Sequence, residues 1–291
     1  MVQASFSFFV MALCVKWASA TLPSLEIVFF RSLIGSAMVF ALILRKHAPV
    51  LGRERGTMTL RGISGFLALT LFFYTIAHLP LGTAVMLNYT GPIFAAIFSV
   101  IFLKEQVSLR LLSMILIAFA GVYFLVNGSN LNSAQPLTPA SFLPHFQWNL
   151  YYFLGLLSAI FAAIAYISIR AVRHSESPLT VIFYFTAIST IGSLFYLPFG
   201  FKWPGFQEWL ALAGVGVGSF YGQIWMTIAL RRAPAALLSP FSYLTPLLSF
   251  LFGIIFWKER LTWVSLLGVF LIILGGSLVS YFETRREPES G

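Results

Sequence analysis

Apolar runs of similar length recur along the whole chain, and short polar segments separate them. An α-helix needs about 20 residues to cross the hydrocarbon core of a bilayer, which is about 30 Å thick. The pattern therefore predicts an all-α integral membrane protein with ten transmembrane helices. These helices are expected at residues 1–17, 25–44, 61–78, 82–103, 109–127, 149–169, 179–200, 208–230, 234–257 and 262–282.

Two stretches of the chain, residues 80–126 and 234–280, carry the same pattern at a constant offset of 154 positions. Each predicted helix before residue 128 thus has a counterpart after it. Because each copy holds five helices, the second copy starts on the opposite side of the membrane, and the fold is expected to be two inverted five-helix repeats. The matched residues are Pro80/Pro234, Tyr89/Tyr243, Pro92/Pro246, Phe98/Phe252, Ile101/Ile255, Phe102/Phe256, Lys104/Lys258, Glu105/Glu259, Leu112/Leu266 and Gly121/Gly275.

The longest polar stretch lies between the two copies and contains three prolines and several turn-forming residues. Such composition is typical of an exposed linker. We expect a first repeat at residues 1–127, an external linker at 128–147, a second repeat at 148–282 and a cytoplasmic tail at 283–291.

The distribution of charge gives the predicted bundle an orientation. The chain is 59% hydrophobic and 9% charged, which excludes an ordinary soluble domain. With the N-terminus inside, 13 of the 18 Lys and Arg residues, Arg61 among them, fall on the cytoplasmic side and four on the other. By the positive-inside rule, we expect both termini in the cytoplasm and the protein in the cell (inner) membrane.

The net charge of +9 is then a consequence of topology and requires no nucleic-acid partner. The expected partners are membrane lipid and a small-molecule metabolite, and a homodimer is possible. There is no Asp, and the nine Glu residues lie at helix ends, in loops or in the tail, so ion coupling through a buried carboxylate has no support. The four His and single Cys14 form no catalytic or metal-binding pattern. We expect no enzyme, no cofactor and no metal site.

Polar side chains gather around two prolines at equivalent depths, Pro92 and Pro246. A proline inside a helix frees a backbone carbonyl and allows a bend, so these two helices are the expected place for a binding site. For each polar residue, a structural hydrogen bond between helices is the alternative. The predicted substrate-binding residues are Arg31, Tyr74, Asn88, Tyr89, Tyr166, Tyr221, Gln223, Trp225, Ser242 and Tyr243.

Arg31 is the most unusual charge because it lies about 9 Å inside the second predicted helix. It either bonds to carbonyls of neighbouring helices or recognises a carboxylate or phosphate of a substrate. Glu26 lies about 140° from Arg31 around the same helix, so Lys16 is its expected partner.

The Lys-Glu pairs, Lys104-Glu105 and Lys258-Glu259, end equivalent helices at opposite mouths of the bundle. They either anchor the helix ends at the lipid headgroups or latch two gates that open in turn.

Three segments together resemble the EamA-type members of the drug/metabolite transporter superfamily: LPSLEIVFFRSLIG, HLPLGTAVMLNYTGPIFAAIFSVIFLKE and AFAG. The resemblance covers nearly the whole chain. It implies alternating access, with four helices of each half around a central cavity and the fifth and tenth packed to one side. It also implies export or exchange of amino acids, their derivatives or other small metabolites. The short first helix departs from this pattern.

We therefore expect a secondary transporter for a small zwitterionic or anionic metabolite, with Arg31 near one end of its path. A channel-like or facilitative pore for small solutes is the alternative.

Overall fold

The computed structural model describes residues 1–91, 93–95, 97–98, 109–130, 149–172, 175–232, 241–259 and 262–286. In these ranges the chain is helical and contains no strand. The helices are α1 (Val2–Ala18), α2 (Ser24–Lys46), α3 (Arg55–His78), α4 (Leu81–Asn88), α6 (Leu109–Asn130), α7 (Leu150–Ala171), α8 (Pro178–Leu194), α9 (Leu197–Gly200), α10 (Phe206–Arg232), α12 (Leu244–Trp257) and α13 (Trp263–Arg286).

Three described helical segments are both long and apolar enough to cross a membrane: Ser24–Lys46, Arg55–His78 and Leu150–Ile169. Five further apolar helices are shorter, and they include most of α1, α8 and α12. Length alone therefore identifies only part of the bundle as membrane-spanning.

The helix ends repeat at the same offset of 154 that relates the two sequence copies. The helices α2 and α8 begin at Ser24 and Pro178, and α3 and α10 end at His78 and Arg232. The starts of α6 and α13 are related in the same way. The duplicated sequence therefore forms duplicated structure.

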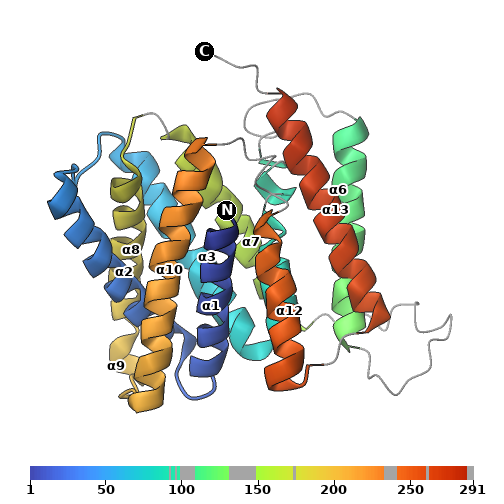
Figure 1. The fold of residues 1–291 in the computed structure, drawn as a ribbon, viewed down its shortest axis with the longest axis horizontal. Coiled ribbons are helices and arrows are strands. Elements are labelled where there is room, and N and C mark those ends of the chain that lie inside the picture. Colours follow the sequence, from blue (N-terminus) through green and yellow to red (C-terminus); the bar gives the residue numbers. More distant parts are fainter. Residues whose placement is uncertain are drawn as a thin grey trace.

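The most extensive helix contacts join the two repeats. They pair α6 with α13, α3 with α7, α1 with α10 and α2 with α8. Exchanging the repeats converts the α1–α10 pair into the α7–α3 pair and leaves the α2–α8 and α6–α13 pairs as they are. Corresponding helices run in opposite directions, as α6 and α13 show in Figure 1. The predicted fold of two inverted five-helix repeats is confirmed.

The fifth and tenth helices, α6 and α13, pack together at one side of the bundle (Figure 1). A Cβ added at Gly121 would lie 2.7 Å from the amide nitrogen of Ile272, and one at Gly275 would lie 2.9 Å from that of Ala118. Small residues that let two backbones approach this closely are the usual device for helix pairing in membranes. The contact is symmetric, because Ala118 and Ile272 are also 154 positions apart.

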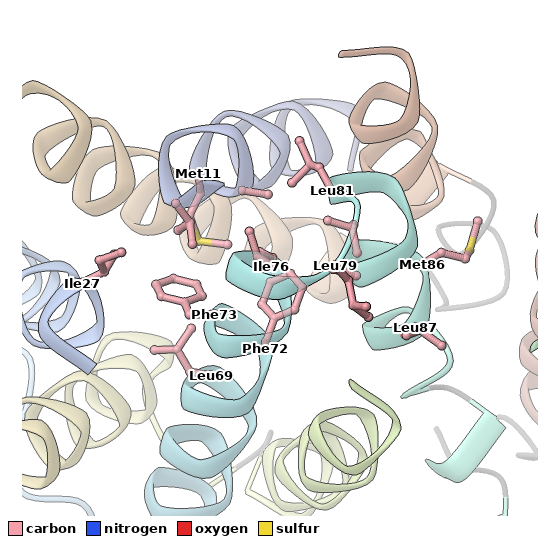
Figure 2. Close-up of a cluster of buried hydrophobic side chains, with 14 of the residues drawn as sticks. Met11, Ile27, Leu69, Phe72, Phe73, Ile76, Leu79, Leu81, Met86 and Leu87 are labelled. Atoms are coloured by element: carbon pink, nitrogen blue, oxygen red, sulfur yellow. The ribbon is translucent and has the colours of Figure 1, made fainter. Parts of the chain in front are cut away.

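A dense apolar layer fills one half of the bundle. Figure 2 shows Met11, Phe73, Ile76 and Leu81 gathered where α1, α3 and α4 meet. Phe73, Ile76 and Leu81 are fully buried. This layer lies beside what we call the lower face, which is formed by the C-terminal ends of α1, α3 and α12 and the start of α4, and is lower in Figure 1.

Several boundaries differ from the prediction. The segment expected as one helix at 179–200 is divided into α8 and α9 by a turn at Phe195 and Tyr196. The last helix extends to Arg286, so it includes residues assigned to the tail, and α6 extends to Asn130 at the start of the predicted linker. Residues 131–148 of the linker region lie outside the described residues.

Candidate functional site

Helical structure is interrupted at the same residue of both repeats. The helix α4 ends at Asn88, and Tyr89 and Thr90 form a turn. The helix α12 begins at Leu244, directly after a turn at Tyr243. The rings of Tyr89 and Tyr243 lie 6.2 Å apart, between centroids, at an angle of 50°. The sequence predicted both residues for the site, and the structure brings them together.

These breaks lie three residues before the positions at which bends were expected. Pro246 is the third residue of α12, where a backbone N–H has no partner within the helix, so its ring costs no hydrogen bond there. Pro246 therefore lies in the first turn of a helix rather than bending one. Its counterpart Pro92 is outside the described residues, as are Lys104 and Glu105.

The start of α1 is joined to the break before α12 through side-chain hydroxyls. Ser5 donates to the carbonyl of Phe241 at 2.9 Å, and Thr245 donates to the carbonyl of Ser5 at 2.9 Å. Thr245 also shares a hydrogen bond with the Tyr89 side chain from the other repeat. The Tyr243 hydroxyl, in contrast, is buried without a partner among the described residues and lies against Gly276 of α13.

Arg31 of α2 is 2% exposed, and its Cζ atom lies 4.9 Å from the centre of the Phe185 ring of α8. Its Nε and Nη1 atoms are buried and make no hydrogen bond within the described part of the chain. The expectation that carbonyls of neighbouring helices satisfy Arg31 is therefore wrong for these two atoms.

Arg61 of α3 contacts the same ring, with its Cζ atom 4.4 Å from the centre of the Phe185 ring. It is 6% exposed, and its buried Nε has no partner among the described residues. The sequence prediction counted Arg61 as a cytoplasmic loop charge, which is wrong because α3 begins six residues earlier, at Arg55. A helix start placed within the mixed polar and apolar segment 55–60 would have put Arg61 inside the helix.

The side chain of Tyr166 connects the two arginines with the helix break at Tyr89. Tyr166 of α7 lies close enough to Arg61 for a direct electrostatic interaction, and the same holds between Tyr166 and Tyr89. Tyr166 keeps 41% of its surface exposed, whereas Arg61 is buried and Tyr89 is partly buried. The helix breaks and the two arginines thus belong to one polar region. Within it, we call Arg31, Arg61, Phe185 and Tyr166 the arginine site.

A second charged group joins the repeats at the lower face. The Lys16 amine at the end of α1 donates to the carbonyls of Ile76 and Leu79, at 2.9 and 2.6 Å. The Glu259 carboxylate, beyond the end of α12, accepts a hydrogen bond from the Leu81 N–H at 2.7 Å, and one from the N–H of Gly82. We call these residues the lower-face cluster.

In this cluster a carboxylate of the second repeat caps the first turn of α4 in the first repeat, where backbone N–H groups have no partner within the helix. Burial raises the pKa of the Glu259 carboxyl, while the Leu81 N–H, Lys16 and the Gly82 N–H act in the opposite direction. Lys16 therefore faces Glu259, and the expectation that it pairs with Glu26 is wrong. Glu26 instead accepts from the backbone N–H of Lys202 at 3.1 Å.

The other predicted residues make contacts of their own, although Asn88 directly precedes Tyr89 and Lys258 directly precedes Glu259. Asn88 donates through its side chain to the Ser158 hydroxyl of α7 at 3.1 Å, which is a bond between helices. Tyr74 of α3 lies 4.3 Å from His78 and 6.0 Å from Tyr151, between ring centres. Lys258 is exposed and ends α12 in the left-handed conformation, with φ of 53°.

The predicted residues of α10, and Ser242 just before α12, all keep part of their surface exposed. Tyr221 and Trp225 are 45% and 37% exposed, and Gln223 and Ser242 are partly buried. The glycine face of α10 packs on α1, because a Cβ at Gly218 would lie 3.0 Å from the carbonyl of Ser7.

A cavity of about 390 Å³ lies between α2, α8 and α10. Its lining is mostly apolar and includes Leu42 and Ile182, and its polar residues are Lys46, Ser177 and Thr227. None of the predicted site residues lines it.

Known transporters are similar to this protein along nearly the whole chain. The model of the EamA-like transporter family matches residues 1–127 and again residues 149–281. The pseudopaline exporter CntI of Pseudomonas aeruginosa is 34% identical over 275 residues, which cover 94% of this chain and 92% of that protein. An uncharacterized transporter of Helicobacter pylori is 27% identical over 287 residues, covering 95% and 92%.

More distant relatives extend the likeness to animals and to solved structures. Human solute carrier family 35 member G1 is 24% identical over 296 residues, covering 97% of this chain and 79% of that protein. A crystal structure covers 97% of this chain with a TM-score of 0.63 at 20% identity, and this likeness establishes the fold. The protein is an integral multi-pass membrane transporter for small metabolites and not an enzyme. With two matches that together span both repeats, the chain belongs to the EamA-like transporter family, within the drug/metabolite transporter superfamily.

Proposed function

We propose that this protein is a secondary transporter that moves a small zwitterionic or anionic metabolite by alternating access, as an exporter or exchanger. The name of the Pseudomonas relative specifies export for that protein, and its similarity over most of both chains supports the same direction here. With both termini in the cytoplasm, as the charge distribution predicts, the lower face is the external face.

The observation that carries this proposal is the lower-face cluster. Lys16 and Glu259 join α1, α3, α4 and α12 across the two repeats, and directly behind them lie the fully buried side chains of Ile76 and Leu81. A channel requires a continuous path, whereas a carrier closes one mouth while it opens the other. At this face a carboxylate of the second repeat binds backbone groups of the first, and such contacts between repeats can form and be lost as the repeats move, which favours a carrier.

Transport kinetics separate the carrier from the facilitative pore. In proteoliposomes, we expect uptake of a labelled metabolite to saturate with concentration and to be stimulated by unlabelled metabolite on the far side. A panel of amino acids, their derivatives and dicarboxylates supplies the substrates. Flux that rises linearly with concentration and shows no counterflow would establish the pore instead.

Opening of the lower face can be followed by chemical labelling. Thr83 of α4 is 2% exposed, so Thr83→Cys in a Cys14→Ser background places a thiol behind the cluster. We expect Glu259→Ala to speed its reaction with a membrane-impermeant maleimide about tenfold or more, because a partly buried hydrogen bond to a charged group is lost. Lys258→Ala, at the exposed neighbouring residue, is the matched control. Equal labelling rates in the two variants would contradict a closing role for Glu259.

A further inference from the structure

We propose that Arg31 and Arg61 together form the binding site for an oxyanion group of the transported molecule, a carboxylate or a phosphate, and that the preferred substrates carry two negative charges. This inference rests on the proposed function and specifies the substrate class of its site.

The position of the site follows from the symmetry of the fold. Phe185 is the counterpart of Arg31 in the second repeat, 154 positions later, and the two side chains touch. Tyr89 and Tyr243 are counterparts that also touch. A residue can contact its own counterpart only if both lie beside the axis that relates the repeats. In inverted-repeat transporters this axis runs through the membrane midplane, where substrates bind.

No described residue balances the charge of the site. No ion pair to Arg31 or Arg61 occurs among the described residues, and the partnerless atoms are the Nε of both and the Nη1 of Arg31. Besides each other, the described side chains that interact with them are the Phe185 ring and Tyr166, neither of which carries a negative charge. Buried charges are normally paired and hydrogen-bonded, so these donors lack an anionic acceptor.

The direction of the Arg61 side chain strengthens this conclusion. A helical arginine near a membrane surface normally extends toward that surface, and the usual side-chain direction, toward the helix N-terminus, would take Arg61 there. Its Nη1 atom lies instead against Gly65, one turn deeper in α3. The absence of a Cβ at Gly65 leaves room for the guanidinium and for Phe185 beside it. The local sequence therefore holds a charge inside the bundle rather than releasing it to water.

The chemistry of the ligand follows from that of the guanidinium. Its planar set of N–H donors matches the paired oxygens of a carboxylate or phosphate. Two such groups around one ring supply two positive charges, which a dicarboxylate or a phosphate monoester would neutralise. The aromatic face stabilises the arginines while no anion is bound. Tyr166, beside Arg61 and partly exposed, marks the side from which a solute reaches them.

The test measures binding without transport, so a protein that binds but does not transport would contradict the proposed function alone. Purified full-length protein in phosphatidylcholine nanodiscs is titrated with succinate and with inorganic phosphate, and its thermal unfolding midpoint gives the affinity. Succinamide, the neutral analogue, and chloride at equal ionic strength are the ligand controls.

We expect a saturable rise in the midpoint with succinate, phosphate or both, and none with succinamide or chloride. Arg31→Gln and Arg61→Gln should each weaken the affinity about tenfold or more, because charge-assisted hydrogen bonds are lost. Arg45→Gln, at an exposed arginine of α2, should leave it unchanged. Gly65→Ala should weaken it by displacing Arg61, whereas Gly56→Ala, with nothing within 4 Å, should not.

Three results would overturn the proposal. One is the absence of any rise with either oxyanion. Another is a rise that persists in both glutamine variants. The third is a midpoint that responds only when phosphatidylglycerol is added to the nanodiscs, with the response lost in the arginine variants, since a lipid headgroup would then be the occupant.

Discussion

The lower-face cluster and the arginine site both place charge between the two repeats, partly buried in the first and buried in the second, and they differ in how that charge is satisfied. In the cluster, the Lys16 amine and Glu259 carboxylate reach backbone groups at 2.6 to 2.9 Å and face each other. In the arginine site, the Nε atoms of Arg31 and Arg61 and the Nη1 atom of Arg31 have no partner among the described residues.

The difference separates two uses of buried charge. Partnered charge stabilises one arrangement of helices, and its removal exposes the groups it satisfied. Unpartnered charge costs stability and persists where it serves a ligand. Neutralising a residue in each group should therefore change stability in opposite directions.

The largest effect is expected for Lys16→Met. This change removes two charge-assisted hydrogen bonds to the end of α3 and leaves Glu259 without its counter-charge, so the protein should lose about 3–5 kcal/mol of stability. Thermal unfolding of the purified protein measures the loss. Lys258→Met, at an exposed residue of the same face, should stay within about 0.5 kcal/mol of the parent protein. Equal losses of stability in the two variants would show that the partnered charge of Lys16 does not stabilise the fold more than an exposed lysine does.

A smaller effect of opposite sign is expected for Arg61→Met. Its side chain has similar length but carries no charge that must be desolvated, so the ligand-free protein should gain about 1 kcal/mol or more. The same unfolding measurement applies, with Arg45→Met as the exposed control. A loss of stability comparable to that of Lys16→Met would make Arg61 a structural residue.

The smallest effect distinguishes the two tyrosines that meet at the axis. Tyr89→Phe removes the hydrogen bond to Thr245 and should cost about 0.5–1.5 kcal/mol. Tyr243→Phe removes a buried hydroxyl that has no partner in the described chain, so stability should be unchanged or slightly raised. Unfolding midpoints of the two variants, compared side by side, give the answer. If Tyr243→Phe lost as much as Tyr89→Phe, its hydroxyl would have a structural partner.

The repeat made much of this arrangement predictable. Because the sequence offset of 154 persists in the helix ends, Tyr89 and Tyr243 could be chosen from the sequence as equivalent residues. Their contact, however, depends on how the repeats pack, which is a property of the whole bundle. Hydropathy also recognised Arg31, since a charge within an apolar run has no surface explanation.

The remaining features could not be predicted for identifiable reasons. Arg61 was missed because the polar start of α3 hides the true beginning of that helix from a hydropathy pattern. The break at Tyr243 precedes Pro246 instead of coinciding with it, because a proline fits the first turn of a helix better than the middle of one. The partner of Glu259 was a backbone group of the other repeat, and sequence pattern carries no signal for such contacts.

The contact between Glu259 and the first N–H groups of α4 sets a condition on the motion itself. If the lower face opens by withdrawing this carboxylate, the amides of Leu81 and Gly82 lose their acceptor in a helix of only eight residues. Such groups are costly unless water replaces the partner. Opening must then hydrate the start of α4, so the transport cycle takes up water at this face. Solutes that lower water activity should shift the protein toward the closed form and slow its turnover.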